Sequence, residues 1–501
     1  MKELAAFLLP PAVAFAGMRV NHLLFGKEFE QRFGGGFKFA LGLAVGMLVF
    51  TQAVLLGTLT GVNLAGWLAW LALIWGVMEA VLLLLKATKG LKQIKFQPGY
   101  FWLLLLLPVI YSWWVFGRLS TLEGTLEFDA NTFWVFKAKI LYLEQGKNLL
   151  PWMHNPELAY AHWDYPMLVP CLYVLNYGAV GGVDEFVNKV WPFWMVVALC
   201  LGILSLAKFW QRPHPLPVAT VMAFCFLPAT MQYIRWEGGT VPMAFYTSLA
   251  ALLIVHAFLS GDSSTLAVSV LVLTGCIMTK FEGAVYAGLW FCALFPFCWR
   301  RGWMKNILLW KAVLVAIVCM LPYILLRLAK PISHPDDAWL HVGLTSPETA
   351  LRNFPQVWFL DVFGCFFSQD FFHWTATDNG GLQWSGHWIG WGGLVNQQLN
   401  VLPWLLMLLL GLSLWKKNGR MIVFALTLVI IGTLTALAMI TACLPHLQGD
   451  VAEVIANVPT AARIYYPYFV ACFLGLMPIW FISLSSPGSV QKQPSGRRTP
   501  H

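Results

Sequence analysis

The sequence predicts an all-α polytopic membrane protein. Of its 501 residues, 59% are hydrophobic and only 11% are charged, whereas soluble proteins carry about a quarter charged residues. Apolar stretches of roughly 20 residues recur along the chain, which is the length that a helix needs to cross a bilayer. The alternating pattern of barrel strands is missing, so the backbone groups of these stretches must find their partners within helices.

The apolar stretches predict about 13 transmembrane helices. We expect them near residues 4–20, 38–60, 63–85, 100–117, 189–207, 216–234, 241–259, 264–279, 284–298, 307–328, 400–415, 421–443 and 464–484. The first of them follows a single lysine and could pass for a signal peptide, but further spans follow it, so we treat it as a retained helix. A shorter apolar helix is expected over 166–181.

The distribution of lysine and arginine predicts the orientation. Basic clusters lie within 86–95, 208–212, 300–305, 416–420 and 492–498. All five fall on one side, the cytoplasmic side, if the helix over 166–181 does not cross the membrane. The opposite face then receives two large loops, 118–188 and 329–399, whose tryptophans suit the membrane interface. These aromatic side chains could also stack on a sugar or a lipid headgroup.

Net charge and cysteine content argue against a nucleic-acid-binding protein and against a protein held together by disulfides or a cysteine-bound metal. The formal charge of +9 follows from the bias of positive residues toward the cytoplasm and from attraction to anionic lipids, so we expect membrane lipids and no nucleic acid as partners. The ten cysteines are scattered through apolar stretches and form no Cys-x-x-Cys pair. They indicate neither a disulfide framework nor a metal site.

The first large loop is the most densely polar interval of the chain. Glu127 and Asp129 follow a span, and side chains two residues apart share a face when the backbone is extended. Together they could act as a general base or hold a divalent cation beside a phosphate. The alternative is structural: Asp129 is well placed to cap the helix expected over 130–143.

That helix has an apolar face and two lysines. Spacings of three and four place Phe133, Phe136, Ile140 and Leu143 on one side. Lys137 and Lys139 could contact a phosphate or lie among lipid headgroups.

The segment HWDYP precedes the short helix. Pro166 suits a first helical turn, and Asp164 suits a capping position just before it. His162 could be an acid, a base or a ligand, and Tyr165 lies beside these groups, although a single histidine in a loop more often has none of these roles.

Three short turns add charges on the same face. They carry Arg235 and Glu237, Lys280 and Glu282, and Arg463 with Tyr466 at the start of the last span. Charges at the ends of spans often extend toward water. Three turns that present arginine or lysine on one face would also suit an anionic lipid phosphate, which arginine binds best.

The order of these motifs resembles the GT-C superfamily of membrane glycosyltransferases, in particular the family 39-like members related to protein O-mannosyltransferases and aminoarabinose transferases. The likeness rests on LEFDANTFWVFKAKILYLEQG, HWDYPMLVP, RWEGGTVPMAFY, TKFEG and TAARIYYP. The likeness covers about residues 100–480. It implies that residues 1–99 are additional membrane helices and that residues 100–484 form the catalytic module. The short polar segment 485–501 is expected to be a disordered cytoplasmic tail. Glu-Phe-Asp and HWDYP depart from the family's Asp-Glu or Asp-x-Asp and His-Pro-Pro motifs, so the substrate does not carry over.

The resemblance implies inverting transfer of a sugar from a polyprenyl-phosphate donor to a glycan, lipid or protein acceptor, at the periplasmic face of a bacterial inner membrane. Asp129 would be the base, with Glu127 assisting it or binding a divalent cation. Arg463, Lys280 and Arg235 would stabilise the departing phosphate. No glycine-rich nucleotide loop is visible, which agrees with a lipid-linked donor.

Two other functional classes remain. A lipid flippase or transporter would use the same charges as a relay, although such proteins commonly show inverted repeats and charges near mid-membrane. A non-catalytic assembly protein would explain the aromatic loops and leaves Glu127 and Asp129 without a shared purpose.

Overall fold

The computed structural model describes six stretches of the chain: residues 2–31, 33–90, 130–144, 149–209, 238–329 and 420–442. Short pieces between 234 and 476 complete it, at 234, 347–348, 351, 354–355, 358, 374–376, 382–384, 410, 467–468, 470–472 and 474–476. The spans expected over 100–117 and 400–415 and almost all of 216–234 lie outside these residues, apart from Ile234 and Leu410. The count of about 13 spans and the division into domains therefore stay predictions.

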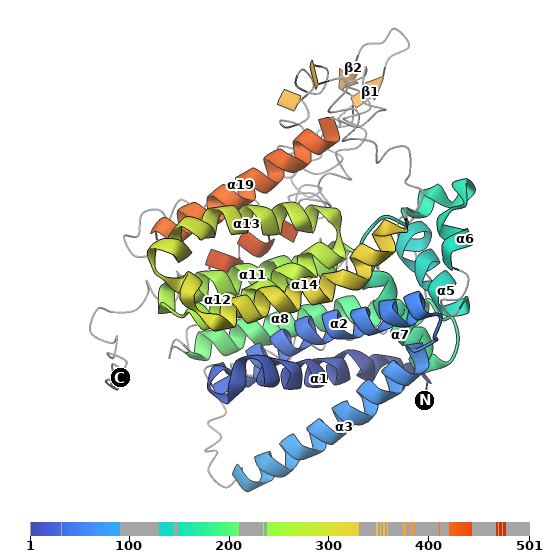
Figure 1. Ribbon diagram of the computed structural model, residues 1–501, viewed down its shortest axis with the longest axis horizontal. Coiled ribbons are helices and arrows are strands. Elements are labelled where there is room, and N and C mark those ends of the chain that lie inside the picture. The colour runs from blue at the N-terminus through green and yellow to red at the C-terminus, as the bar shows by residue number, and fades with distance from the viewer. Residues whose placement is uncertain are drawn as a thin grey trace.

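The described part of the chain is built almost entirely of helices (Figure 1). They are α1 (Lys2–Gln31), α2 (Gly35–Thr60), α3 (Ala65–Gly90), η2 (Ala130–Val135), α5 (Phe136–Leu143), α6 (Leu149–Met153), η3 (Pro156–Ala161), α7 (Leu168–Val180), η4 (Phe186–Lys189), α8 (Val190–Phe209), α11 (Thr240–Ser260), α12 (Ser263–Thr279), α13 (Phe281–Arg300), η5 (Trp303–Lys305), α14 (Ile307–Leu328) and α19 (Arg420–Ala442). Two short strands, β1 (Trp374–Ala376) and β2 (Leu382–Trp384), pair antiparallel with Trp374 opposite Trp384.

Eight of the described helices are long and apolar enough to cross a membrane. They are α1 to Gly26, α2, α3 to Leu82, a stretch from Phe186 to Leu206 within η4 and α8, and α11, α13, α14 and α19. The chain is therefore a multi-pass membrane protein, as its composition predicted.

Local sequence explains where several helices begin and end. Gly61 and Gly261 follow α2 and α11 with positive φ angles of 71°, the left-handed conformation that glycine adopts without strain. Asp262 and Asn306 precede α12 and α14, and their side chains accept hydrogen bonds from the backbone N–H groups of Ser264 and Leu308. A glycine therefore ends α2 and α11, and a side-chain cap begins α12 and α14.

The first two helices pack at backbone distance. A Cβ atom added to Gly42 would lie 2.3 Å from the carbonyl oxygen of Ala14, and one added to Gly46 would lie 2.2 Å from that of Val13. Gly17 faces the same contact, because its added Cβ would lie 1.9 Å from the oxygen of Gly42. Small residues that let backbones approach are typical of helix packing in membranes.

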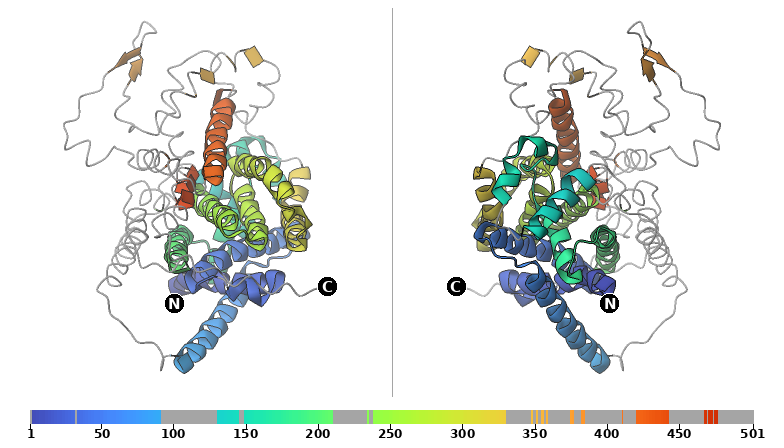
Figure 2. Two further views of the ribbon diagram at one scale, coloured as in Figure 1. Left: turned by 90° about the vertical axis from the view of Figure 1, so that its left-hand side faces the viewer. Right: turned by 90° about the vertical axis from the view of Figure 1, so that its right-hand side faces the viewer.

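Helix α3 leans away from the rest of the bundle (Figures 1 and 2). Trp67 is 80% exposed, and most of the apolar side chains that follow it on α3 are exposed as well, as expected for a lipid-facing surface. An ion pair between Arg19 of α1 and Glu79 of α3 ties the two helices together: Nε of Arg19 donates to Oε1 of Glu79, and Nη2 donates to Oε2.

The bundle has two ends with different contents. One, which we call the loop end, carries α5, α6 and α7 (Figure 1). The ring Nε2 of His154 after α6 and the carbonyl oxygen of Ala329 after α14 lie 2.9 Å apart there. The opposite end, which we call the basic end, carries Arg300, Arg301 and Lys305, and there Asn306 donates to the hydroxyl of Ser263 over 2.7 Å.

Helix α7 does not run from one end of the bundle to the other. The segment before it contacts the last turns of α14, while Gly178 near its other end packs against the start of α3, with Ala65 only 2.5 Å from an added Cβ. Both contacts lie at the loop end. At 13 residues, α7 is about 20 Å long, too short for a hydrocarbon core of about 30 Å. The short helix expected over 166–181 is therefore observed over 168–180, and its failure to cross the membrane stays a prediction.

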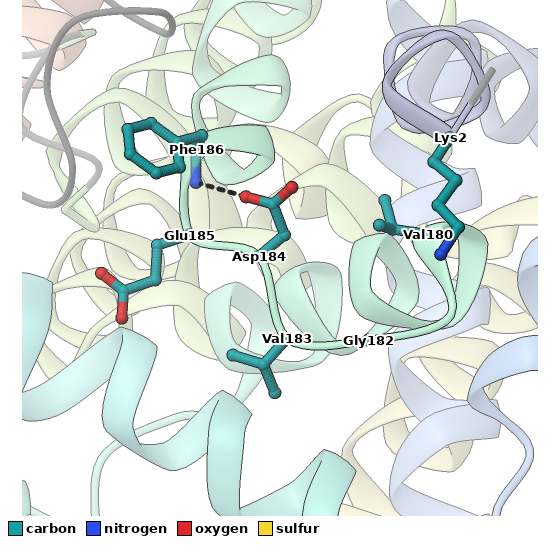
Figure 3. Close-up of a pocket in the computed structure, with 7 residues that line it drawn as sticks. All are labelled: Lys2, Val180, Gly182, Val183, Asp184, Glu185 and Phe186. Carbon is teal, nitrogen blue, oxygen red and sulfur yellow. Dashed lines mark hydrogen bonds between the residues drawn. The ribbon is translucent and has the colours of Figure 1, made fainter.

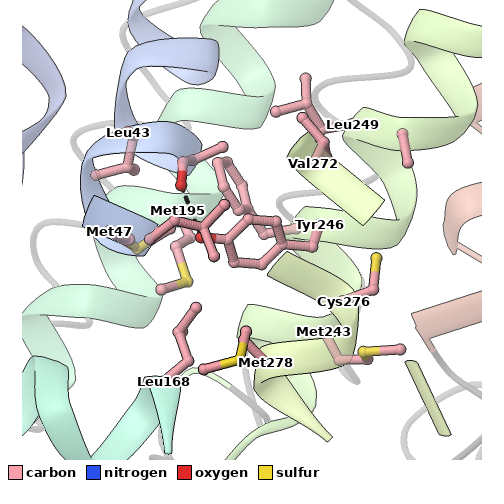
Figure 4. Packing of buried hydrophobic residues seen from close by; sticks show 14 of the residues in the cluster. Leu43, Met47, Leu168, Met195, Met243, Tyr246, Leu249, Val272, Cys276 and Met278 are labelled. Carbon is pink, nitrogen blue, oxygen red and sulfur yellow. Dashed lines mark hydrogen bonds between the residues drawn. The ribbon is translucent and has the colours of Figure 1, made fainter. Parts of the chain in front are cut away.

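The core between α2, α8, α11 and α12 is centred on Tyr246 (Figure 4). Its hydroxyl donates to the carbonyl of Ala44 over 2.8 Å, which satisfies the polar tip of an otherwise apolar ring. Its ring fills the space left by Gly275, where an added Cβ would lie 1.9 Å from the ring. Sulfur side chains such as Met47 and Met243 fill the surrounding space.

Candidate functional site at the loop end

Five segments that are distant in sequence meet at the loop end. They are η2 with α5, the link before α7, the start of α11, the link between α12 and α13, and the last turns of α14. Of the residues that the sequence singled out, Lys137, His162, Asp164, Tyr165 and Lys280 lie in this group.

Lys137 is the centre of the group and is fully buried. Its ammonium donates to the backbone carbonyl of His162 over 3.0 Å. It also lies 5.0 Å from the ring centroid of Trp134 and 5.8 Å from that of Tyr165, so two aromatic faces stabilise the charge. Burial raises the pKa of the Cys171 thiol in α7, and the nearby charge of Lys137 opposes part of that rise.

The burial of Lys137 corrects the expected orientation of its helix. Leu143, which the spacing placed on the apolar face, is 63% exposed, whereas Lys137 and Ala138 are buried. Within α5 the buried residues are Lys137, Ala138, Ile140 and Leu141, so the helix packs on more than one side, and Leu143 lies at its exposed end. Residues 130–135 before it form a π-helix rather than the α-helix that the spacing predicted.

His162 has the left-handed backbone conformation, with a φ of 48°. It ends the 3-10 helix η3, and its ring packs against Phe133 and Tyr165, with ring centroids 4.3 and 4.8 Å away. The ring thus belongs to an aromatic cluster, and the backbone carbonyl is the group that binds Lys137.

Asp164 does not cap α7. That helix begins at Leu168 behind Met167, which makes no capping bond with its side chain. The Asp164 carboxylate instead pairs with Arg327 of α14 over 3.3 Å, and its backbone carbonyl accepts a hydrogen bond from the hydroxyl of Tyr323 over 2.8 Å. Asp164 is thus paired with Arg327, a residue that the local sequence around Asp164 could not indicate.

Phe281 joins this pair to the lysine cluster. Its ring lies 4.9 Å from that of Tyr165, edge to face, and 5.5 Å from the guanidinium of Arg327. Arg327 and Tyr323 were not singled out from the sequence, because they lie inside the expected span 307–328. Arg327 could have been found from the sequence as an arginine at the end of a span that faces the loop side.

Lys280 lies across the start of α11. A Cβ added to Gly239 would lie 2.7 Å from Cε of Lys280 and 3.1 Å from the ring of Trp134. The missing side chain at Gly239 thus leaves room for the stem of Lys280 beside the start of α11, and the ring of Trp134, over which Lys137 lies, approaches the same position. Within the described part of the chain, no carboxylate pairs with Lys280. Its neighbour Glu282 occupies the first turn of α13.

Lys139 lies apart from this group. It pairs with Glu185 in the link between α7 and η4. Glu185 also lines a shallow pocket of about 520 Å³ between the N-terminus of α1 and this link. Figure 3 shows Lys2 on one wall, and Asp184, which accepts the backbone N–H of Phe186 over 3.0 Å, on the other.

The remaining candidates from the sequence, Glu127, Asp129, Arg235, Glu237, Arg463 and Tyr466, lie outside the described residues. Ala130, which follows Asp129 in the chain, is fully buried at the start of η2. Among the described residues, no three histidine, cysteine or acidic side chains group as metal ligands would. The divalent cation expected at Glu127 and Asp129 stays a prediction.

No family model, curated protein or solved structure matches this chain.

Proposed function

We propose that the protein is a membrane glycosyltransferase that moves a sugar from a polyprenyl-phosphate donor to an acceptor hydroxyl at the loop end. In this proposal the loop end faces the periplasm of a bacterial inner membrane, and the basic end faces the cytoplasm. The resemblance to GT-C enzymes suggests the reaction, and the charges at the loop end support it.

The observation that carries the proposal is the grouping of cations at one end of the bundle. Lys137, Lys280 and Arg327 come from α5, the α12–α13 link and α14, and aromatic rings connect them. Cations held in place by surrounding structure suit a group that gains negative charge during a reaction. A phosphate leaving group at the membrane boundary is such a group.

The proposed step is a single displacement. The oxygen of the acceptor hydroxyl attacks the anomeric carbon while the bond from that carbon to the phosphate oxygen breaks. Asp129 accepts the hydroxyl proton, and the lipid phosphate leaves with the bonding electrons. General bases of this kind contribute about 10²–10⁴-fold. Lys280, Arg463 and Arg235 would stabilise the phosphate, and Glu127 would assist Asp129 or hold a cation with it.

The test is transfer by purified protein in liposomes with a radiolabelled polyprenyl-phosphate sugar. Asp129→Asn is expected to lower transfer at least 100-fold, in line with the loss of a general base, with expression unchanged. Asp184→Asn, a carboxylate at the same end but outside the cation group, is the matched control and should retain transfer. Normal transfer by Asp129→Asn would remove this residue from the mechanism.

A flippase remains the second candidate because of the Arg19–Glu79 pair, which joins two expected spans. Ionisable residues inside spans often mark a transport pathway. Label that only changes leaflet, without reaching an acceptor, would favour this candidate, and loss of that movement in Glu79→Gln would assign it to the pair.

A further inference from the structure

Several buried polar atoms have no hydrogen-bond partner among the described residues, and two of them come close together. These two are Oε2 of Glu282, in the first turn of α13, and the hydroxyl of Tyr468. Tyr468 is fully buried. Buried tyrosine hydroxyls normally find a partner, and an unpaired polar group in the interior costs about 1–3 kcal/mol.

Both groups lie near Tyr286 of α13. Tyr286 lies four residues after Glu282 and therefore on the same face of α13, and its ring centroid is 5.5 Å from that of Tyr468. The Glu282 carboxylate is close enough to act electrostatically on the Tyr468 hydroxyl. An acceptor and a donor thus share one region without bonding to each other.

Two neighbouring hydroxyl groups have backbone carbonyls as partners. The Tyr286 hydroxyl already donates to the carbonyl of Thr247 over 3.1 Å, and the Thr247 hydroxyl lies within hydrogen-bond distance of the carbonyl of Pro467, 3.2 Å away. These bonds also fix the segment that carries Tyr468 against α11. Tyr468 therefore follows a residue whose carbonyl is bonded to α11.

We propose that Glu282 and Tyr468 bind a hydroxyl group of a carbohydrate, which accepts a hydrogen bond from Tyr468 and donates one to Glu282. A hydroxyl is the neutral group that offers one donor together with acceptor lone pairs. This inference rests on the proposed function, because the carbohydrate would be the sugar of the lipid-linked donor.

The position on α13 supports this assignment. Lys280, the proposed phosphate contact, is two residues before Glu282, and Tyr286 is one turn beyond it. The start of α13 could thus contact both parts of a sugar phosphate.

The first experiment measures thermal stabilisation of the purified full chain in detergent. The probes are decaprenyl phosphate alone and decaprenyl phosphate carrying glucose, N-acetylglucosamine or arabinose. At least one sugar-bearing lipid should raise the melting temperature of the wild type beyond the bare phosphate. Tyr468→Phe and Glu282→Gln should lose most of that added shift and keep the shift due to the phosphate.

Tyr246→Phe is the matched control, because it removes a buried tyrosine hydroxyl that already has a partner. It should lower the melting temperature of the free protein and keep the sugar-dependent shift. Tyr468→Phe should leave the free protein as stable as the wild type or more stable, since its hydroxyl is unpaired. A clear loss of stability in Tyr468→Phe, with the sugar shift retained, would mean a structural role and overturn the proposal.

Transfer kinetics separate this inference from the proposed function. Tyr468→Phe should raise KM for the sugar donor about tenfold, as expected for one lost hydrogen bond. Unchanged KM and kcat in that variant would overturn the hydroxyl site and leave the transferase intact. If the wild type transfers no sugar, the proposed function fails, and the melting shifts still decide the hydroxyl site: no added shift with any of the three sugars rejects it.

Discussion

Lys137 and His162 are joined by a buried hydrogen bond from the lysine ammonium to the histidine backbone carbonyl, 3.0 Å long. The left-handed backbone at His162 lies at the point where η3 ends. The course of the first loop and the position of the buried charge therefore depend on each other. This contact links the loop to α5 and sets the position of the aromatic rings around it.

Replacing Lys137 with methionine should destabilise the protein by about 1.5–3 kcal/mol, the range for a lost hydrogen bond to a charged group. Methionine keeps most of the side-chain length but leaves the His162 carbonyl without this donor. Thermal unfolding in detergent measures the effect. Lys139→Met is the matched control on the same helix, and its partly exposed pair with Glu185 should contribute less than about 1 kcal/mol. Equal losses in the two variants would contradict the importance of the buried bond.

The left-handed backbone conformation of His162 leads to a second prediction, on the stability of variants at this position. Asparagine tolerates the left-handed conformation, whereas a β-branched residue does not. His162→Asn and His162→Val both remove the ring contacts with Phe133 and Tyr165, so their difference reports the backbone alone. The valine variant should be less stable by about 1–2 kcal/mol. Identical melting temperatures would show that the loop adopts another conformation.

Gly178 provides a test of the contact between α7 and α3. An alanine Cβ there would lie 2.5 Å from the backbone of Ala65, so Gly178→Ala should destabilise the protein by about 1–3 kcal/mol, as overpacking does. Gly182, four residues on, has nothing within 4 Å of an added Cβ. Gly182→Ala should therefore leave the melting temperature nearly unchanged, and an equal loss there would place the sensitivity in the loop rather than in the helix contact.

The two ends of the bundle predict opposite accessibility in sealed vesicles. A cysteine at Asp184 should react with an impermeant maleimide from one side, and a cysteine at Lys305 only from the other. The wild-type chain, with its own cysteines, sets the background labelling. Reaction of both positions from the same side would overturn the arrangement of helices between them.

The positions of the helices could be predicted from the lengths of the apolar stretches. The lysine and arginine clusters predicted which helix ends lie on the same side. The short helix α7 could be predicted from its apolar residues, and the basic clusters predict that it does not cross the membrane. These signals work because lipid accepts only helices of sufficient length and disfavours charge within the core.

The side-chain partners could not be predicted in the same way. The spacing of Asp164 matched a helix cap, but the competing partner, Arg327, comes from a helix more than a hundred residues later. The burial of Lys137 gave no signal in the spacing, because α5 packs on more than one side and its partner, the His162 carbonyl, lies in a later link. Tyr468 gave no signal, since an unpaired hydroxyl is a property of its packed surroundings and not of local sequence.

The close contact between α1 and α2 also bears on assembly. Glycines at 17, 42 and 46 allow these two helices to meet along their backbones, and both are complete before the first loop is synthesised. Domains and hairpins that emerge first during translation can fold first. The hairpin of α1 and α2 can therefore serve as a template, against which α7 and α8 pack once they have been synthesised.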